Sequence, residues 1–88
     1  MEPTFTPDDL ASAFEAHRGR MLELVRKRLD PLLLRRLSHE DALQEAYLAC
    51  AKRLGYFARE PEVPVYFKLR TVLLQTIADL YIERSILR

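Results

Sequence analysis

The sequence predicts an all-α fold, a three-helix bundle in one domain. The chain has 88 residues, of which 49% are hydrophobic, and it contains 2 glycines. No stretch alternates apolar and polar residues as a half-buried strand does. Apolar residues instead recur at three- and four-residue spacing over three long stretches bounded by helix-capping signals. Three helices packed side by side are the simplest way to bury three apolar stripes.

The first helix is expected at about residues 7–29. Thr6 is a suitable N-cap and Pro7 fits the first helical position. A bend or break near Gly19 is the main alternative, because a mid-helix glycine costs ~1 kcal/mol relative to alanine. Residues 1–6 show no periodic pattern and are expected to form a flexible lead-in. The positions at helical spacing are Leu10, Phe14, His17, Met21, Leu24, Val25 and Arg28.

A short, turn-like connector is expected at 31–37. Asp30-Pro31 ends the first helix because the residue before a proline is pushed out of the α region. The second helix is expected at 39–54, with Ser38 as its N-cap and Gly55 in the left-handed conformation just after it. The leucines of the connector, which are expected to cap the core between the helices, are Leu32, Leu33, Leu34 and Leu37.

The third helix is expected at 64–86. Pro64 can open it at its first position. Between the second and third helices, residues 56–63 carry two aromatic residues, a proline and mixed charge, which indicates an ordered surface loop.

The charge is unevenly placed along the chain. The formal net charge is +1, but residues 18–36 hold seven basic and two acidic residues, so one part of the surface is expected to be basic. No segment approaches the ~20 apolar residues of a membrane span, and the acidic start does not resemble a signal peptide. We therefore expect a cytoplasmic protein without a membrane partner.

No pattern for catalysis or metal binding is present. His39-Glu40 lacks the second histidine of a zinc protease motif, because Leu43 stands at that position. Cys50 lies on an apolar stripe and is expected to be a core residue in a reducing compartment. There is no glycine-rich phosphate loop. We expect no catalytic residue, metal or cofactor, and hence no enzyme.

The helix at 39–54 has two faces. An apolar face, to which Leu43, Tyr47 and Cys50 belong, is expected to be mostly buried. A second stripe carries two acids, an amide and a leucine, and is expected to face solvent. It is either an ordinary solvated helix face or a docking surface for arginines of a partner. Its members are Asp41, Gln44, Glu45 and Leu48.

Aromatic and basic residues alternate around the loop and the start of the third helix. Aromatic rings grip unstacked bases while lysine and arginine bind phosphates, so this mixture suits single-stranded DNA. The alternative is that Phe57, Phe67 and one tyrosine are core residues with ordinary solvated charges beside them. The set is Tyr56, Phe57, Arg59, Tyr66, Phe67, Lys68 and Arg70.

The stretch Glu40-Asp41-Ala42-Leu43-Gln44-Glu45-Ala46-Tyr47-Leu48 resembles the second conserved region of bacterial RNA polymerase sigma factors, most closely the extracytoplasmic-function (ECF) group. The resemblance extends in order from about Leu10 to Arg84. Further matching segments are Phe14-x6-Met21-Leu22, Arg28-Leu29-Asp30-Pro31, Leu69-Arg70-x-Val72-Leu73 and Ala78-Asp79.

The resemblance implies that residues 7–88 form the family's region 2 helical domain. In that family the Asp-x-x-Gln-Glu helix docks on the clamp helices of the polymerase β′ subunit, which implies polymerase binding by Asp41, Gln44, Glu45 and Leu48. The following loop, here 56–63, holds a flipped-out base of the non-template strand of the promoter minus-ten element. An anti-sigma factor is a further partner that the resemblance admits. From the aromatic and basic pattern together with this resemblance, the residues expected to bind DNA are Tyr56, Phe57, Arg59, Tyr66, Lys68, Arg70 and Gln75.

Four positions differ from the family's pattern. Lys68 stands where tryptophan is usual, Gln75 where asparagine is usual, and Ile82-Glu83 where arginines are usual. No segment resembles the family's helix-turn-helix domain. Three alternatives stay open. The first is a helical module that binds polymerase or itself without promoter recognition. The second is a general dimerisation domain, which an exposed apolar stripe would reveal, and the third is a small helical enzyme.

Overall fold

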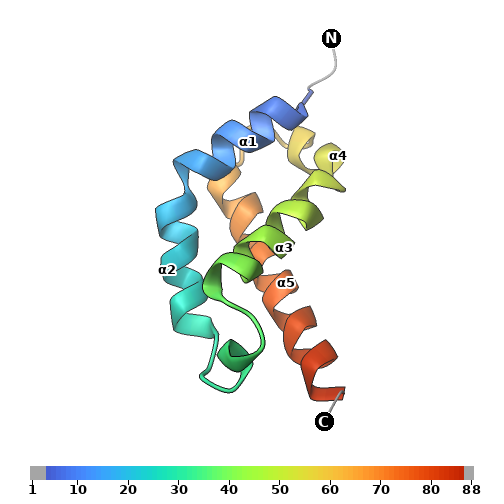
Figure 1. Ribbon diagram of the computed structural model, residues 1–88. Coiled ribbons are helices and arrows are strands. Elements are labelled where there is room, and N and C mark those ends of the chain that lie inside the picture. Colours follow the sequence, from blue (N-terminus) through green and yellow to red (C-terminus); the bar gives the residue numbers. More distant parts are fainter. Residues whose placement is uncertain (1–3, 87–88) are drawn as a thin grey trace.

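The computed structural model describes residues 4–86, with the side chains of residues 4–83. Over this range the chain is helical and contains no strand, which confirms the predicted all-α fold. Its elements are α1 (Pro7–Ala16), α2 (Arg18–Arg28), the 3₁₀ turn η1 (Leu33–Arg35), α3 (His39–Ala51), α4 (Leu54–Ala58) and α5 (Val65–Ile86). Figure 1 shows α1 and α2 as a bent arm beside α3 and α5, and α5 is the longest helix.

The first expected helix is in fact two helices. The backbone leaves helical geometry at His17, with φ −109° and ψ 9°. The prediction of a single helix over 7–29 is therefore wrong, and the break lies just before Gly19, which is itself inside α2. The bend lets Phe14 of α1 and Met21 of α2 both reach the core, although the two helices run in different directions (Figure 1).

Thr6 caps α1 as predicted. Its Oγ1 accepts a hydrogen bond from the backbone N–H of Asp9 at 3.1 Å, and the Asp9 carboxylate accepts one from the Thr6 N–H at 2.9 Å. Phe5, which the sequence placed in a flexible lead-in, stacks on Phe57 with ring centroids 5.2 Å apart. This part of the lead-in belongs to the folded domain, whereas residues 1–3 lie outside the described residues.

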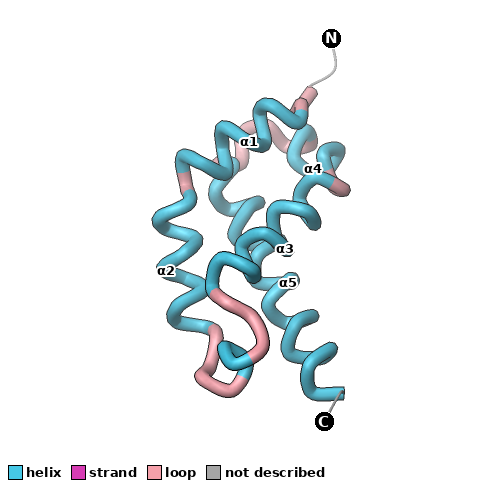
Figure 2. Tube along the Cα trace, in the orientation of Figure 1, coloured by secondary structure: helices cyan, strands magenta, loops and turns pink. Residues whose placement is uncertain are grey.

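The end of α2 is tied to α5 through Tyr81. The Tyr81 hydroxyl donates to the carbonyl of Arg28 at 2.8 Å and accepts from the N–H of Asp30 at 2.9 Å. The Asp30 carboxylate accepts from the N–H of Leu33 at 2.9 Å, which starts η1. Asp30-Pro31 thus ends the helix as predicted and opens the connector, whose loops are pink in Figure 2.

The connector buries part of its leucines. Leu33 and Leu37 are in the core and Leu34 is half-buried. Leu32 is 71% exposed, so the expectation that it caps the core is wrong. Three consecutive residues of a tight turn point in different directions, because a 3₁₀ turn has 3.0 residues per turn.

The central helix ends earlier than predicted. α3 stops at Ala51, and Gly55 lies inside the short α4 with no positive φ, so both the end at Leu54 and the left-handed glycine are wrong. After a turn at 52–53, α4 carries Phe57 into the core. The surface loop expected at 56–63 is therefore wrong for residues 56–58, and the loop begins only at Arg59. The left-handed residue is instead Glu60, with φ 52°.

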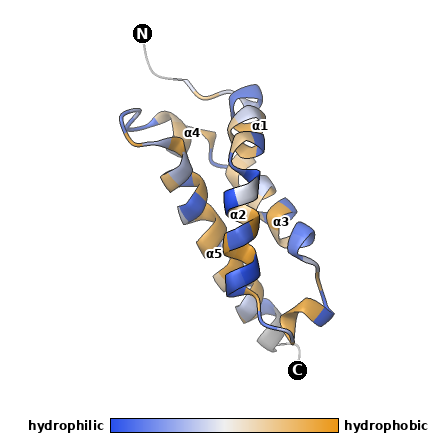
Figure 3. Cartoon of the chain, turned by 90° about the vertical axis from the view of Figure 1, so that its left-hand side faces the viewer, coloured by the Kyte–Doolittle hydropathy of each residue, from blue (hydrophilic) through white to orange (hydrophobic). Residues whose placement is uncertain are grey.

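The core is formed by all the described helices together with the connector. α5 begins at Val65, directly after Pro64, and runs to 86; residues 87–88 lie outside the described part. In Figure 3 most of α5 is hydrophobic, while α2 carries several strongly hydrophilic residues. The buried apolar residues are Leu10, Phe14, Met21, Val25, Leu29, Leu33, Leu37, Ala42, Leu43, Ala46, Cys50, Phe57, Leu69, Val72, Leu73, Ile77 and Leu80.

Candidate functional site

The second stripe of α3 lies on the solvent side of the helix. Its two acids and its amide are exposed, and its leucine is 48% exposed. On the other side Leu43 and Cys50 are buried and Tyr47 is half-buried, with its ring edge-on to Phe14 at 5.1 Å. The prediction of one exposed and one mostly buried face is confirmed. The exposed residues, here called the α3 stripe, are Asp41, Gln44, Glu45 and Leu48.

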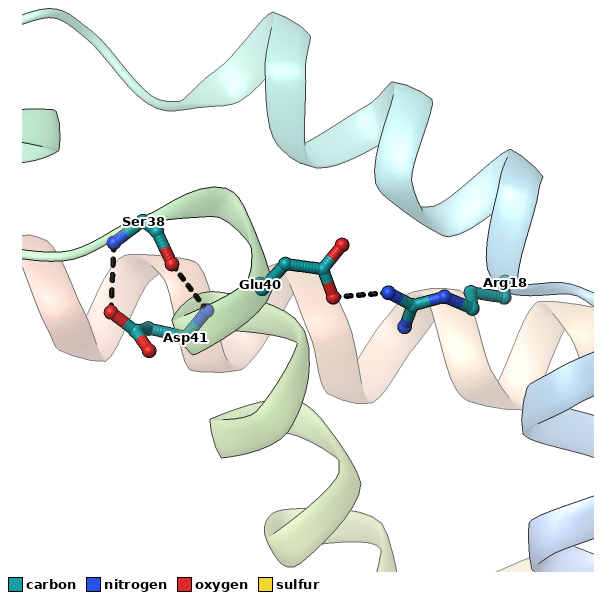
Figure 4. A network of polar contacts seen from close by, with 4 residues as sticks. All are labelled: Arg18, Ser38, Glu40 and Asp41. Carbon is teal, nitrogen blue, oxygen red and sulfur yellow. Dashed lines mark hydrogen bonds and ion pairs between the residues drawn. The ribbon is translucent and has the colours of Figure 1, made fainter.

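A polar network fixes the N-terminal end of the α3 stripe (Figure 4). The hydroxyl of Ser38 accepts from the N–H of Asp41 at 3.0 Å, and Asp41 Oδ2 accepts from the N–H of Ser38 at 2.9 Å. Asp41 therefore serves the helix cap as well as the stripe. Glu40 beside it pairs with Arg18 of α2. The hydrogen bond and the charge of Glu40 raise the pKa of Arg18 above its usual value.

Shallow hollows border the α3 stripe on both sides. One of about 430 Å³ lies between α1, α2 and α3, beside the N-terminal half of the stripe. Another of about 580 Å³ lies between the connector, α3 and α5. A third of about 420 Å³ borders the C-terminal half, where Asp79 and Glu83 of α5 add carboxylates to those of α3. The stripe is thus a ridge between depressions that side chains of a partner can fill.

Phe57 is a core residue. It is 4% exposed, stacks on Phe5, and packs edge-on against Tyr56 at 5.3 Å. The ring cannot stack on a base without leaving the core. This position corrects the assignment of Phe57 to DNA binding and agrees with the alternative that it is a core residue.

Lys68 is also buried, at 5% exposure. Its ammonium donates hydrogen bonds to the carbonyls of Phe57 and Glu60, each at 3.1 Å, and to that of Arg59. A lysine ammonium has three N–H donors, so all of them are used inside the domain. The assignment of Lys68 to DNA binding is corrected in turn, because its charge is held by backbone carbonyls.

The other predicted DNA-binding residues reach the surface to different degrees. The guanidinium of Arg20 lies 3.7 Å from the centre of the half-buried Tyr66 ring, so a cation already covers one ring face. The exposed amide of Gln75 accepts from Arg53 at 2.7 Å. The rest are the exposed Arg59 and the half-buried Tyr56 and Arg70.

Phe67, at the start of α5, belongs to the aromatic and basic set found in the sequence, although it is not among the residues assigned to DNA binding. The alternative that Phe67 is a core residue is wrong, because its ring is exposed. It is 57% exposed, and its ring centroid lies 6.2 Å from that of Tyr66. Leu69, Val72 and Leu73 fix the buried side of α5, and position 67 falls on the opposite side. The helical spacing of these buried apolar residues is the sequence signal that identifies Phe67 as a surface residue.

The chemistry of single groups adds little to this site. Burial raises the pKa of the Cys50 thiol to about 12, against an opposing effect of the nearby Arg53 charge, so the thiol stays protonated at neutral pH. In the described part of the chain, histidine, cysteine and acidic side chains form no group of three that could hold a metal ion. Among its helices, none combines the length and the apolar character needed to cross a bilayer.

Comparisons with protein-family models, with curated proteins and with solved structures gave no match to this chain.

Proposed function

We propose that this protein is a transcription initiation factor domain of the ECF sigma type. In this proposal it docks on the β′ clamp helices of core RNA polymerase through the α3 stripe. It holds the non-template strand of the promoter at the α4–α5 loop (residues 59–64) and the start of α5. The observation that supports docking is the exposure of the whole α3 stripe in the folded domain. A cytoplasmic location and control by an anti-sigma factor belong to the same proposal.

The α3 stripe has the chemistry of a helix-docking surface. Carboxylates and an amide can accept hydrogen bonds from arginines of partner helices, and bonds of this charge-assisted kind contribute ~1.5–3 kcal/mol each. Leu48 can fill the gap between two such helices, while the hollows beside the stripe accept neighbouring side chains. Because Asp41 is shared with the helix cap, Gln44 and Glu45 are the stronger contributors to docking.

Glu45→Lys is expected to weaken binding to core polymerase roughly 10- to 150-fold, because it replaces a charge-assisted hydrogen bond with repulsion. The free energy of unfolding should change by no more than ~0.5 kcal/mol, since the site is exposed. Pull-down with core polymerase, followed by titration, measures the binding affinity. Thermal denaturation measures the change in stability. Glu62→Lys, the same charge reversal at an exposed position off the stripe, should bind like wild type. Equal binding by Glu45→Lys and wild type would contradict the docking role.

The DNA-binding half of the proposal is supported by the exposed Arg59 and Phe67 and the half-buried Arg70. One small domain offers few phosphate contacts, so binding to a short non-template oligonucleotide should be weak and should fall steeply with salt. Fluorescence anisotropy at two salt concentrations measures it. Absence of binding at low salt, with polymerase docking intact, would reject promoter recognition.

A second candidate is an interaction module that binds polymerase without recognising promoters. The burial of Phe57 and Lys68 favours it, because it removes one ring and one cation from the proposed DNA-binding surface. A general dimerisation domain is less supported. The exposed large apolar residues of the described chain lie on separate segments instead of forming one stripe: Leu32 in the connector, Leu48 on α3, and Phe67 and Ile82 far apart on α5.

A further inference from the structure

We propose that Lys68 is a positioning residue that fixes the shape of the α4–α5 loop, and that it makes no contact with DNA itself. The loop's role in holding a strand rests on the proposed function. The positioning role rests on the contacts of Lys68 alone. It therefore stands or falls independently of whether this domain binds DNA.

The contacts of Lys68 join three parts of the chain. From the first turn of α5 its ammonium reaches the carbonyl of Phe57 in α4 and those of Arg59 and Glu60 in the loop. A buried charge is strongly unfavourable unless hydrogen bonds compensate it. All three donors are satisfied here by carbonyls from one short stretch of chain, residues 57–60. The bonds to these carbonyls therefore favour the path that the loop takes between α4 and α5.

The loop has few other bonds that would hold this path. The N–H of Arg59 donates to the carbonyl of Gly55 at 3.2 Å, and that of Val63 to the carbonyl of Glu60 at 3.0 Å. Glu60 has φ 52°, which residues other than glycine adopt only at a free-energy cost. Its carbonyl accepts from both Val63 and Lys68. Lys68 thus stabilises a backbone conformation that the local sequence alone disfavours.

Lys68→Met tests this role, because methionine keeps an unbranched apolar stem and lacks the ammonium. We expect the backbone amides of Arg59 and Val63 to exchange with solvent at least about tenfold faster, since their hydrogen bonds depend on the loop's path. The exchange of α3 core amides should change much less. Lys27→Met removes the same charge from an exposed position of α2 and should leave both loop amides unchanged.

Oligonucleotide affinity separates positioning from direct contact. A lysine bound to a phosphate of single-stranded DNA contributes about −0.7 to the slope of log K against log salt concentration. If Lys68 acts through the loop, Lys68→Met lowers the affinity about fivefold or more but leaves this slope at the wild-type value. A slope smaller in magnitude by about 0.7, with loop exchange unchanged, would overturn the proposal.

A measurement on the unaltered protein covers the case in which Lys68→Met fails to fold. The ammonium protons of Lys68 should exchange slowly enough to be observed by ¹⁵N-edited NMR, and their signal should not move when the oligonucleotide is added. A rapidly exchanging Lys68 ammonium would overturn the proposal. If the wild-type domain binds no oligonucleotide, the DNA-binding half of the proposed function fails, while the amide and ammonium exchange still decide the role of Lys68.

Discussion

Phe57→Ala is expected to lower the free energy of unfolding by ~3–5 kcal/mol. The ring of this α4 residue is buried and contacts Phe5 and Tyr56, so its removal leaves a cavity and takes away the stacking partner of Phe5. The total stability of a domain is only ~5–15 kcal/mol, so this variant loses a large share of it. Urea denaturation followed by circular dichroism measures the loss.

Phe67→Ala makes the same chemical change at an exposed position of α5 and serves as the matched control. Its free energy of unfolding should stay within ~0.5 kcal/mol of wild type. If the ring stacks on a base, oligonucleotide binding should weaken by ~1–3 kcal/mol, which is roughly 5- to 150-fold. A large loss of stability in Phe67→Ala, together with little loss in Phe57→Ala, would contradict the placement of Phe57 in the core and of Phe67 on the surface.

Leu73→Ala is expected to lower the free energy of unfolding by ~2–5 kcal/mol, which lowers the melting temperature by at least about 8 °C. Leu73 is 0% exposed near the middle of α5, which is packed along α3, so the cavity cannot be filled by solvent. Thermal denaturation measures the shift, and polymerase docking should persist at temperatures where the variant is folded.

Leu48→Ala is the matched control for Leu73→Ala. This leucine is half exposed on the α3 stripe, so its truncation should cost much less stability and should instead weaken docking. Comparable losses of melting temperature in both variants, with docking unaffected in either, would show that the two faces of α3 and α5 have been assigned wrongly.

The features that sequence predicts well are local ones. The start of α3 follows from Ser38 and Asp41, whose reciprocal bonds involve residues three positions apart. The division of α3 into two faces follows from the spacing of Leu43 and Cys50 against Glu45. Neither depends on how the rest of the chain is arranged.

The features that sequence misses depend on distant contacts. The bend at His17 allows two helices to cover the same core, and a single periodic stripe does not reveal it. Gly55 stays helical because burial of Phe57 outweighs the preference of glycine to end a helix. The burial of Lys68 could not be predicted, because its partners are carbonyls whose position depends on the path of the loop.

The bridge from Tyr81 to Arg28 and Asp30 bears on the order in which the chain folds during synthesis. These bonds join residues 53 and 51 positions apart in the sequence. The backbone groups at the end of α2 therefore cannot bond to Tyr81 until most of α5 has left the ribosome. The entropy of closing a loop grows only slowly with its length, but contacts between distant residues slow folding. During synthesis the end of α2 therefore gains its hydrogen bonds to Tyr81 only after the residues of α5 up to position 81 have emerged.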